Sequence, residues 1–207
     1  MTAEWAGVWV QVAYAVITLL LFVAAVWGDL LRRRWAGARL AVCVNNPAGV
    51  LVPRGSGRRV WFFHLRVRNR RRYSTGVATV TVTKLEYCNE RGVFVPEVFP
   101  GPLPLLWAYS EVYGVQRTVG AEAICDLGFI DEGASAFVLA LAVRPNNVTG
   151  AIQRGQVARV HLVAEVDGYP QRESCVLEIS WNGEWSDDAA TMFANVKIAA
   201  LPAQGAR

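Results

Sequence analysis

The stretch that decides the fold is Val60–Arg68, VWFFHLRVR. Apolar side chains occupy every second position, at Trp61, Phe63, Leu65 and Val67, and mostly polar side chains lie between them. Successive side chains of a β-strand point to opposite faces of a sheet, so this pattern predicts a strand with one buried face.

The same two-residue period recurs on both sides of this strand and predicts further short strands. Four prolines between residues 92 and 104 predict an edge strand that breaks into an extended loop. No alternation of strands with helices is present, so we expect a mainly β fold, an immunoglobulin-like antiparallel β-sandwich. The other expected strands are 39–45, 77–87, 105–110, 121–127, 136–144, 157–166, 174–181 and 192–199.

Residues 5–28, WAGVWVQVAYAVITLLLFVAAVWG, contain no charged residue. As a helix they would measure about 36 Å, enough to cross a bilayer core. Trp5, Trp9 and Trp27 lie toward the ends, where tryptophan prefers the headgroup level. The sequence therefore predicts one N-terminal transmembrane α-helix. A buried soluble helix and a cleaved signal peptide are the alternatives, although the start carries Glu4 and no Lys or Arg.

These patterns divide the chain into five parts. They are a short N-terminal tail (1–4), the transmembrane helix (5–28), a basic juxtamembrane segment (29–36), a β-sandwich domain (37–200) and a flexible tail (201–207).

The orientation of the span follows from the arginines that flank it. Arg32, Arg33 and Arg34 follow the apolar run, and no Lys or Arg precedes it. Basic residues next to a span are retained on the cytoplasmic side, so we expect the N-terminus outside and the β-domain in the cytoplasm. Cysteines there would be reduced thiols. The four are Cys43, Cys88, Cys125 and Cys175.

Charge is divided along the chain. Residues 30–85 carry twelve Arg and one Lys with no acidic residue, whereas residues 86–207 carry fifteen acidic and eight basic residues. The basic part is the part next to the membrane, where anionic lipid attracts it. Arginine interleaved with aromatic residues also occurs in nucleic-acid-binding surfaces, but no nucleic-acid-binding signature is present, so nucleic acid is the less favoured ligand. The candidate basic surface consists of Arg66, Arg68, Arg70, Arg71 and Arg72.

The search for catalytic or metal-binding groups finds no complete set. The cysteines are widely spaced, without a CxxC pair. His64 and His161 both fall on outward positions of their strands; strand pairing that joined them would still require a third group. Neighbouring carboxylates such as Asp131-Glu132 point to opposite faces of a strand, and Ser186 followed by Asp187 and Asp188 suits a helix N-terminus. We expect no cofactor, no metal and no enzymatic activity. A small hydrolase or metal-dependent enzyme built on sandwich loops is the alternative.

The apolar helix also carries a stripe of smaller and more polar side chains. Such stripes allow close helix–helix packing in lipid, so we hypothesise a homo-oligomer formed through this face. The stripe consists of Gly7, Gln11, Tyr14, Thr18, Leu21, Ala25 and Gly28.

Taken together, several segments resemble a group of uncharacterised bacterial proteins anchored by a single membrane span. The segments are WGD (27–29), FHLRVRN (63–69), RRRYS (70–74), CDLG (125–128) and EISWNGEW (178–185). The resemblance covers most of the chain. It implies the architecture and a bacterial plasma membrane, and it carries no established activity.

The sequence thus favours a non-enzymatic β-sandwich module, anchored in the lipid bilayer, that binds an unidentified protein partner at the inner face of the membrane. The acidic distal part and the exposed sheet edges are the expected contact regions. Binding of anionic lipid or nucleic acid through the basic surface is the alternative.

Overall fold

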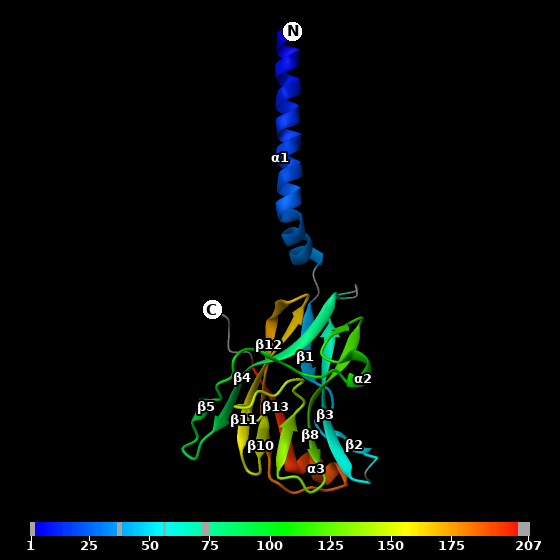
Figure 1. The fold of residues 1–207 in the computed structure, drawn as a ribbon, viewed down its shortest axis with the longest axis vertical. Coiled ribbons are helices and arrows are strands. Elements are labelled where there is room, and N and C mark those ends of the chain that lie inside the picture. The colour runs from blue at the N-terminus through cyan, green and yellow to red at the C-terminus, as the bar shows by residue number, and fades with distance from the viewer. Residues whose placement is uncertain (1–2, 37–38, 56, 72–74, 203–207) are drawn as a thin grey trace. The chain divides into compact units, whose positions relative to one another are not determined.

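The computed structural model describes residues 3–36, 39–55, 57–71 and 75–202. The protein is mainly β, with antiparallel sheets and one apolar N-terminal helix (Figure 1). Internal contacts divide the chain into two compact units, Met1–Ala38 and Arg39–Arg207. We describe each unit by itself.

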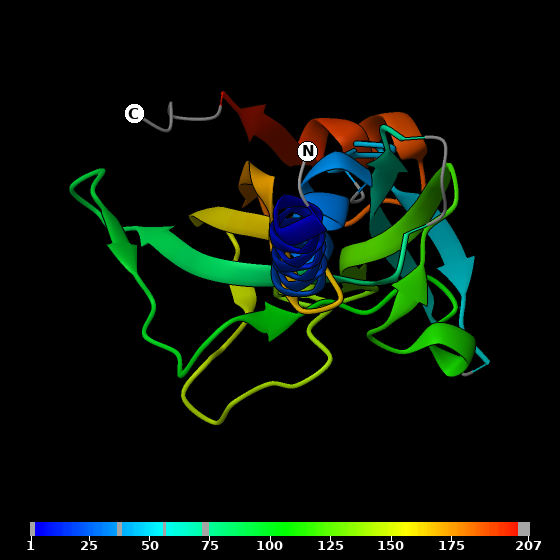
Figure 2. The ribbon, with the colours of Figure 1, turned by 90° about the horizontal axis from the view of Figure 1, so that it is seen from above.

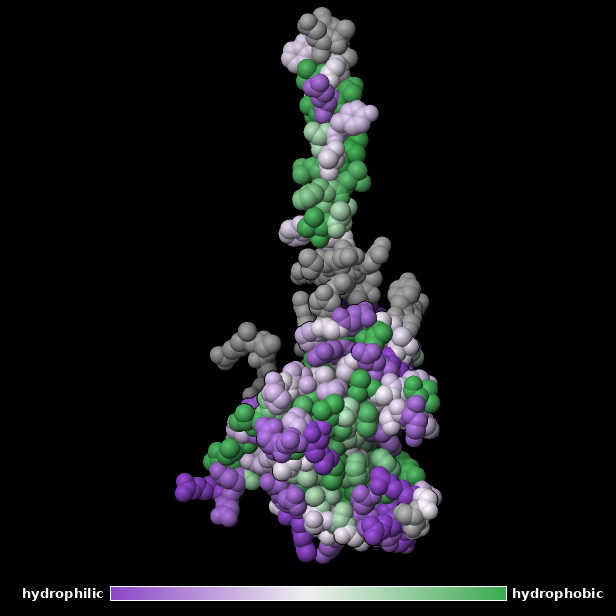
Figure 3. Space-filling view, viewed as in Figure 1, coloured by the Kyte–Doolittle hydropathy of each residue, from purple (hydrophilic) through white to green (hydrophobic). Residues whose placement is uncertain are grey.

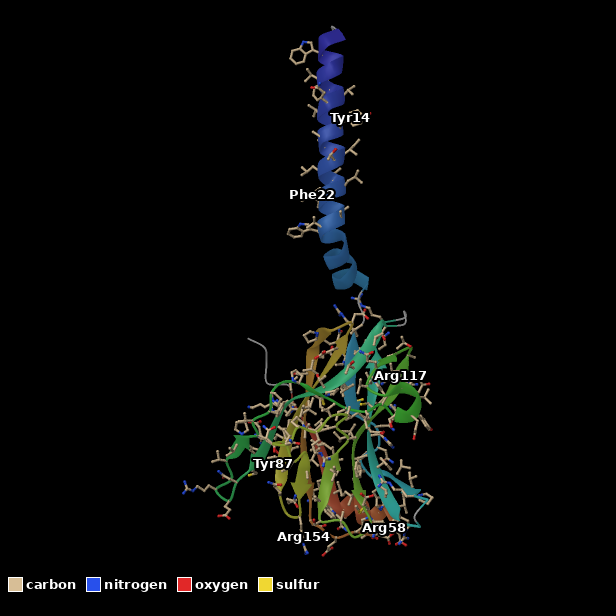
Figure 4. The ribbon with its side chains drawn as sticks, viewed as in Figure 1. Tyr14, Phe22, Arg58, Tyr87, Arg117 and Arg154 are labelled. Atoms are coloured by element: carbon tan, nitrogen blue, oxygen red, sulfur yellow. The ribbon has the colours of Figure 1, made fainter. Side chains whose placement is uncertain are left out.

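The first unit contains one helix, α1 (Ala3–Ala36), which includes a 22-residue apolar segment, Gly7–Gly28. This segment is about 33 Å long, and it is apolar enough to cross a membrane. None of its apolar window is buried by other parts of the structure, and side chains such as Tyr14 and Phe22 project into the surroundings (Figure 4). The helix continues through the basic segment 29–36, because Leu, Arg and Ala favour helix and no Gly or Pro intervenes before Gly37.

The second unit is built from two antiparallel sheets (Figure 1). In the first sheet, β1 and β2 share one edge of β3, and the order continues to β8, β9 and β10. Its strands are β1 (Leu40–Val44), β2 (Val50–Pro53), β3 (Arg59–Asn69), β8 (Glu122–Asp131), β9 (Ala136–Leu139) and β10 (Ala151–Gln153).

In the second sheet, the order is β13-β12-β11-β4-β5, and two further short strands, β6 and β7, also pair with β4. Its strands are β4 (Val77–Cys88), β5 (Phe94–Pro96), β6 (Leu103–Pro104), β7 (Arg117–Thr118), β11 (Val157–Val166), β12 (Tyr169–Trp181) and β13 (Val196–Leu201). Two short helices, α2 (Ser110–Tyr113) and α3 (Ala189–Asn195), connect strands.

The core lies between the inner faces of the two sheets, as the alternation predicted. Trp61, Phe63, Leu65 and Val67 of β3 are all buried. The second sheet contributes a buried row on β11, so both sheets contribute to the core. The β11 row consists of Ala158, Val160, Leu162, Ala164 and Val166.

One of the expected strands is wrong, and another is confirmed with different bounds. Residues 105–110 form only isolated bridges, because the chain turns there: Trp107 N donates to Gly114 O, and α2 begins at Ser110. The strand expected at 192–199 begins only at Val196, because α3 occupies the residues before it. The predicted helix start is confirmed, since the Asp188 side chain caps α3 by accepting a hydrogen bond from Thr191 N at 2.7 Å.

Candidate functional site

The predicted basic surface divides into arginines with different partners. Arg66 donates from both Nε and Nη2 to Asn45 Oδ1, at 2.9 and 2.7 Å, so its guanidinium is held against the first sheet. Arg68 is exposed, and in the described part of the chain no carboxylate pairs with it. Arg70 Nη1 lies 2.9 Å from Glu173 Oε1. The backbone N of Arg71 donates to Asn69 Oδ1, and Arg72 lies outside the described residues.

A cavity of about 340 Å³ lies where β1 and the end of β3 meet β12. Arg68, Asn69 and Arg70 line it from the first sheet, and Glu173 and Ser174 line it from the second. The structure therefore brings two of the five predicted arginines together at one depression. It also places a carboxylate beside one of them.

Two cysteines line the same cavity, Cys43 on β1 and Cys175 on β12. Cys43 is exposed, whereas Cys175 is partly buried. Burial first, and the nearby Cys43 second, raise the pKa of the Cys175 thiol to about 11. At neutral pH the Cys175 thiol is therefore protonated and a poor nucleophile.

Two of the three aromatic residues at 61–63, Trp61 and Phe63, do not share a surface with the arginines of the basic stretch. Trp61 and Phe63 are buried in the core, on the face of β3 opposite Arg66 and Arg68. Phe62 lies on the outer face, with its ring stacked parallel to His64 at 6.2 Å. Most of the aromatic surface next to these arginines is therefore inside the protein.

The two histidines lie on different sheets, so strand pairing does not bring them together. His64 Nδ1 on β3 lies 2.9 Å from Asp126 Oδ1, and His161 Nε2 on β11 lies 2.8 Å from Glu86 Oε2. Within the described ranges, no three His, Cys, Asp or Glu side chains are grouped so that they could hold a metal ion.

Glu86 accepts from two cationic or potentially cationic groups. Lys84 Nζ lies 2.7 Å from Glu86 Oε1, on the opposite carboxylate oxygen from His161. Burial opposes ionisation of Glu86, but the hydrogen bonds from Lys84 and His161 outweigh it and lower the pKa of the carboxyl below its usual value. Glu86 is therefore an ionised carboxylate on the outer face of the second sheet, and both of its oxygens have partners.

The predicted anchor residues all lie on α1. Trp5, Trp9 and Trp27 are exposed, as the predicted contacts with lipid headgroups require. Arg32, Arg33 and Arg34 follow on the same helix, but their side chains lie outside the described part of the chain. On the polar stripe, Thr18 Oγ1 donates to Tyr14 O at 2.8 Å, which satisfies this hydroxyl within the helix.

Sequence analysis missed an apolar surface on the segment 89–98, which we call the β5 arm. The arm extends away from the rest of the second sheet (Figures 1 and 2). It pairs with β4 through Cys88↔Phe94, Tyr87↔Val95 and Glu86↔Pro96. Arg159 of β11 lies over the Phe94 ring, 3.6 Å from its centroid, and fastens that side of the arm to the sheet.

The opposite side of the β5 arm carries exposed apolar side chains. Val93 and Val95 are 56% and 49% exposed, and Val98 is 79% exposed. By strand alternation Val95 shares a face with Leu85 of β4, which is buried in the core. The arm therefore continues the inner face of the second sheet, and Asn147 and Thr149 contact its base through Val98 O and Glu97 Oε1. Figure 3 shows apolar surface next to the hydrophilic tip of the arm. The prolines predicted this edge from the sequence, but no local signal showed that the valines of the arm are exposed.

We found no matching protein-family model, no matching curated protein and no matching solved structure for this chain.

Proposed function

We propose that this protein is a membrane-anchored, non-enzymatic module that binds a protein partner through the β5 arm. The observation that carries the proposal is the exposed apolar surface that Val93 and Val95 form on one side of the arm, with the exposed Val98 after it. Contiguous exposed apolar surface on a folded domain is typical of an interaction site. An edge strand also offers unpaired backbone groups to an incoming strand.

The geometry of the arm supports a site for a partner with an apolar strand or groove. Asn89 organises its turn, since Asn89 Oδ1 accepts from the backbone N of both Arg91 and Val93. Arg159 fixes the arm through Phe94. A rigid apolar surface loses little conformational entropy on binding, so it favours association.

We further propose that α1 crosses the bacterial plasma membrane with the N-terminus outside and the β-unit in the cytoplasm. The length and apolar character of Gly7–Gly28 support the span. Arg32, Arg33 and Arg34 at one end support the orientation. We infer an immunoglobulin-like sandwich for the β-unit, because two antiparallel sheets enclose one core.

Photo-crosslinking from the arm tests the proposed function. A photoreactive phenylalanine analogue placed at Val93 of the full chain, in its native membrane, should give a discrete adduct with one protein. Val95→Glu in the same chain should abolish the adduct, because it places a charge in the apolar contact. The matched control is Val112→Glu on α2, where Val112 is 74% exposed but lies outside the arm.

The yield of the adduct should not fall when crosslinking is carried out in moderate salt, since salt does not screen an apolar contact. Equal effects of Val95→Glu and Val112→Glu, or no discrete adduct from position 93, would overturn the proposal.

A further inference from the structure

The cavity between β1, β3 and β12 presents several hydrogen-bond donors to one space. Its lining includes Arg68 and Arg70, whose side chains carry guanidinium groups, and Ser174, whose side chain carries a hydroxyl. The volume of about 340 Å³ is roughly ten times that of one water molecule in the liquid. A phosphate group with part of an attached glycerol fits in such a space.

We propose that this cavity binds the phosphate of an anionic phospholipid headgroup. Guanidinium groups present parallel N–H donors that match two phosphate oxygens, and two such groups beside one cavity favour a doubly contacted anion. Arg68 is exposed and, in the described part of the chain, no carboxylate holds it, so it is ready to take up an anion.

Glu173 is the group that the headgroup must displace. The side chains of Arg70 and Glu173 are 60% and 47% exposed, so their ion pair is screened by water and holds Arg70 weakly. A phosphate entering the cavity gains both arginines, while Glu173 turns toward solvent. Glu173 thereby makes the cavity selective for strongly anionic ligands, because only these compete with its carboxylate for Arg70.

The β1 residues that line the cavity follow α1 closely in the sequence, and this favours a lipid headgroup over free phosphate as the ligand. β1, which lines the cavity, begins at Leu40, only four residues after α1 ends at Ala36. If α1 spans the bilayer, the effective concentration of headgroups near this part of the chain far exceeds that of a soluble ligand. This step rests on the membrane anchoring in the proposed function and is independent of the β5 arm.

The test uses the full chain in a neutral detergent, titrated with phosphatidylglycerol or with phosphatidylcholine, with bound lipid measured by native mass spectrometry. Phosphatidylglycerol should bind the wild-type chain more tightly, because the choline ammonium is repelled by the two arginines. The double variant Arg68→Gln and Arg70→Gln should weaken phosphatidylglycerol binding on the order of thirtyfold. All variants keep Arg32, Arg33 and Arg34, so any lipid bound at these arginines contributes equally to every measurement.

Two further variants separate headgroup binding from a structural role of the arginines. Glu173→Gln removes the competing carboxylate and should strengthen phosphatidylglycerol binding about two- to fivefold, which a merely structural ion pair would not do. Arg91→Gln, on the exposed tip of the β5 arm, is the matched control and should leave binding unchanged.

Equal binding by the double variant and the control, or weaker binding by Glu173→Gln, would overturn the proposal. Inorganic phosphate tests the source of the ligand: competition only far above the lipid concentration supports the headgroup, whereas equal potency overturns the assignment to lipid. Retention of the wild-type chain in alkaline-washed membranes reports on anchoring alone, so its failure is distinguishable from failure of this cavity to bind.

Discussion

Arg59 Nη2 lies 2.8 Å from Glu132 Oε1, and the same guanidinium reaches Asp187 Oδ2 at 2.9 Å. Arg59 begins β3 of the first sheet, whereas Asp187 lies in the loop after β12 of the second. The Arg59 guanidinium also lies over the Trp185 ring, 4.9 Å from its centroid. One arginine therefore ties the two sheets together at this end of the β-unit.

This arrangement predicts a dependence of stability on pH. Hydrogen bonds from the Arg59 side chain and backbone lower the pKa of Glu132 below its ordinary value of 4.5. The stabilisation is present above that ordinary value and is lost as the pH falls through the folded-state pKa. The urea midpoint of the wild-type chain should therefore fall below pH 4.5, and Glu132→Gln should fall less steeply. Parallel pH profiles for the two proteins would contradict this role.

The core should be sensitive at Phe63. Phe63 is fully buried on β3, and its ring centroid lies 5.4 Å from that of Phe137. Phe63→Ala should lower the free energy of unfolding by about 3–5 kcal/mol, because it removes buried area and leaves a cavity. Phe193→Ala is the matched control: Phe193 is 51% exposed on α3, so its effect should stay within about 0.5 kcal/mol. Denaturant titration measures both, and comparable losses would show that the assigned core is wrong.

The close approach of β9 leaves no room for a side chain at Gly128, which lies next to a β-bulge. The pairing of β3 with β8 shifts register between Phe63 and His64, and a Cβ at Gly128 would lie 2.5 Å from both the Phe137 ring and Val138 O. Gly128→Ala should therefore destabilise the β-unit by about 1–3 kcal/mol. Gly120→Ala meets no atom within 4 Å and should leave the thermal midpoint nearly unchanged. Equal midpoints for the two variants would exclude the close packing at the bulge.

The cysteines should differ strongly in reactivity. Cys125 is buried, and burial raises the pKa of its thiol well above the ordinary value. Cys43 is exposed. Alkylation of the native chain at pH 8 should therefore modify Cys43 long before Cys125, with peptide mass spectrometry as the readout. Similar rates at the two positions would indicate that the β-unit opens freely.

Local alternation was enough to predict the core strands. The row Trp61, Phe63, Leu65 and Val67 was assigned correctly because one face of β3 is buried along its whole length. The prolines near residue 96 correctly predicted an edge strand, since β5 pairs only with β4 in the described structure. The residues at 105–110 are also mostly apolar, which is why a strand was predicted there. In the structure the chain turns instead, and Trp107 N donates to Gly114 O.

The candidate sites depend on contacts that no local pattern contains. Arg70 and Glu173 are separated by 103 positions in the sequence, and Arg59 and Asp187 by 128. The exposure of Val93 and Val95 on the β5 arm depends on how the two sheets are arranged, which no local pattern contains. Sequence analysis could therefore name the arginines, but not which of them share a cavity or which are already paired.

Thiol accessibility in cells tests the central claim, a single anchor that keeps the β-unit in the cytoplasm. A membrane-impermeant maleimide is applied to intact cells and to permeabilised cells, and labelling of the exposed Cys43 is read by peptide mass spectrometry. If the β-unit lies in the cytoplasm, Cys43 is labelled only after permeabilisation. Labelling of Cys43 in intact cells would place the β-unit on the outer side and contradict this claim.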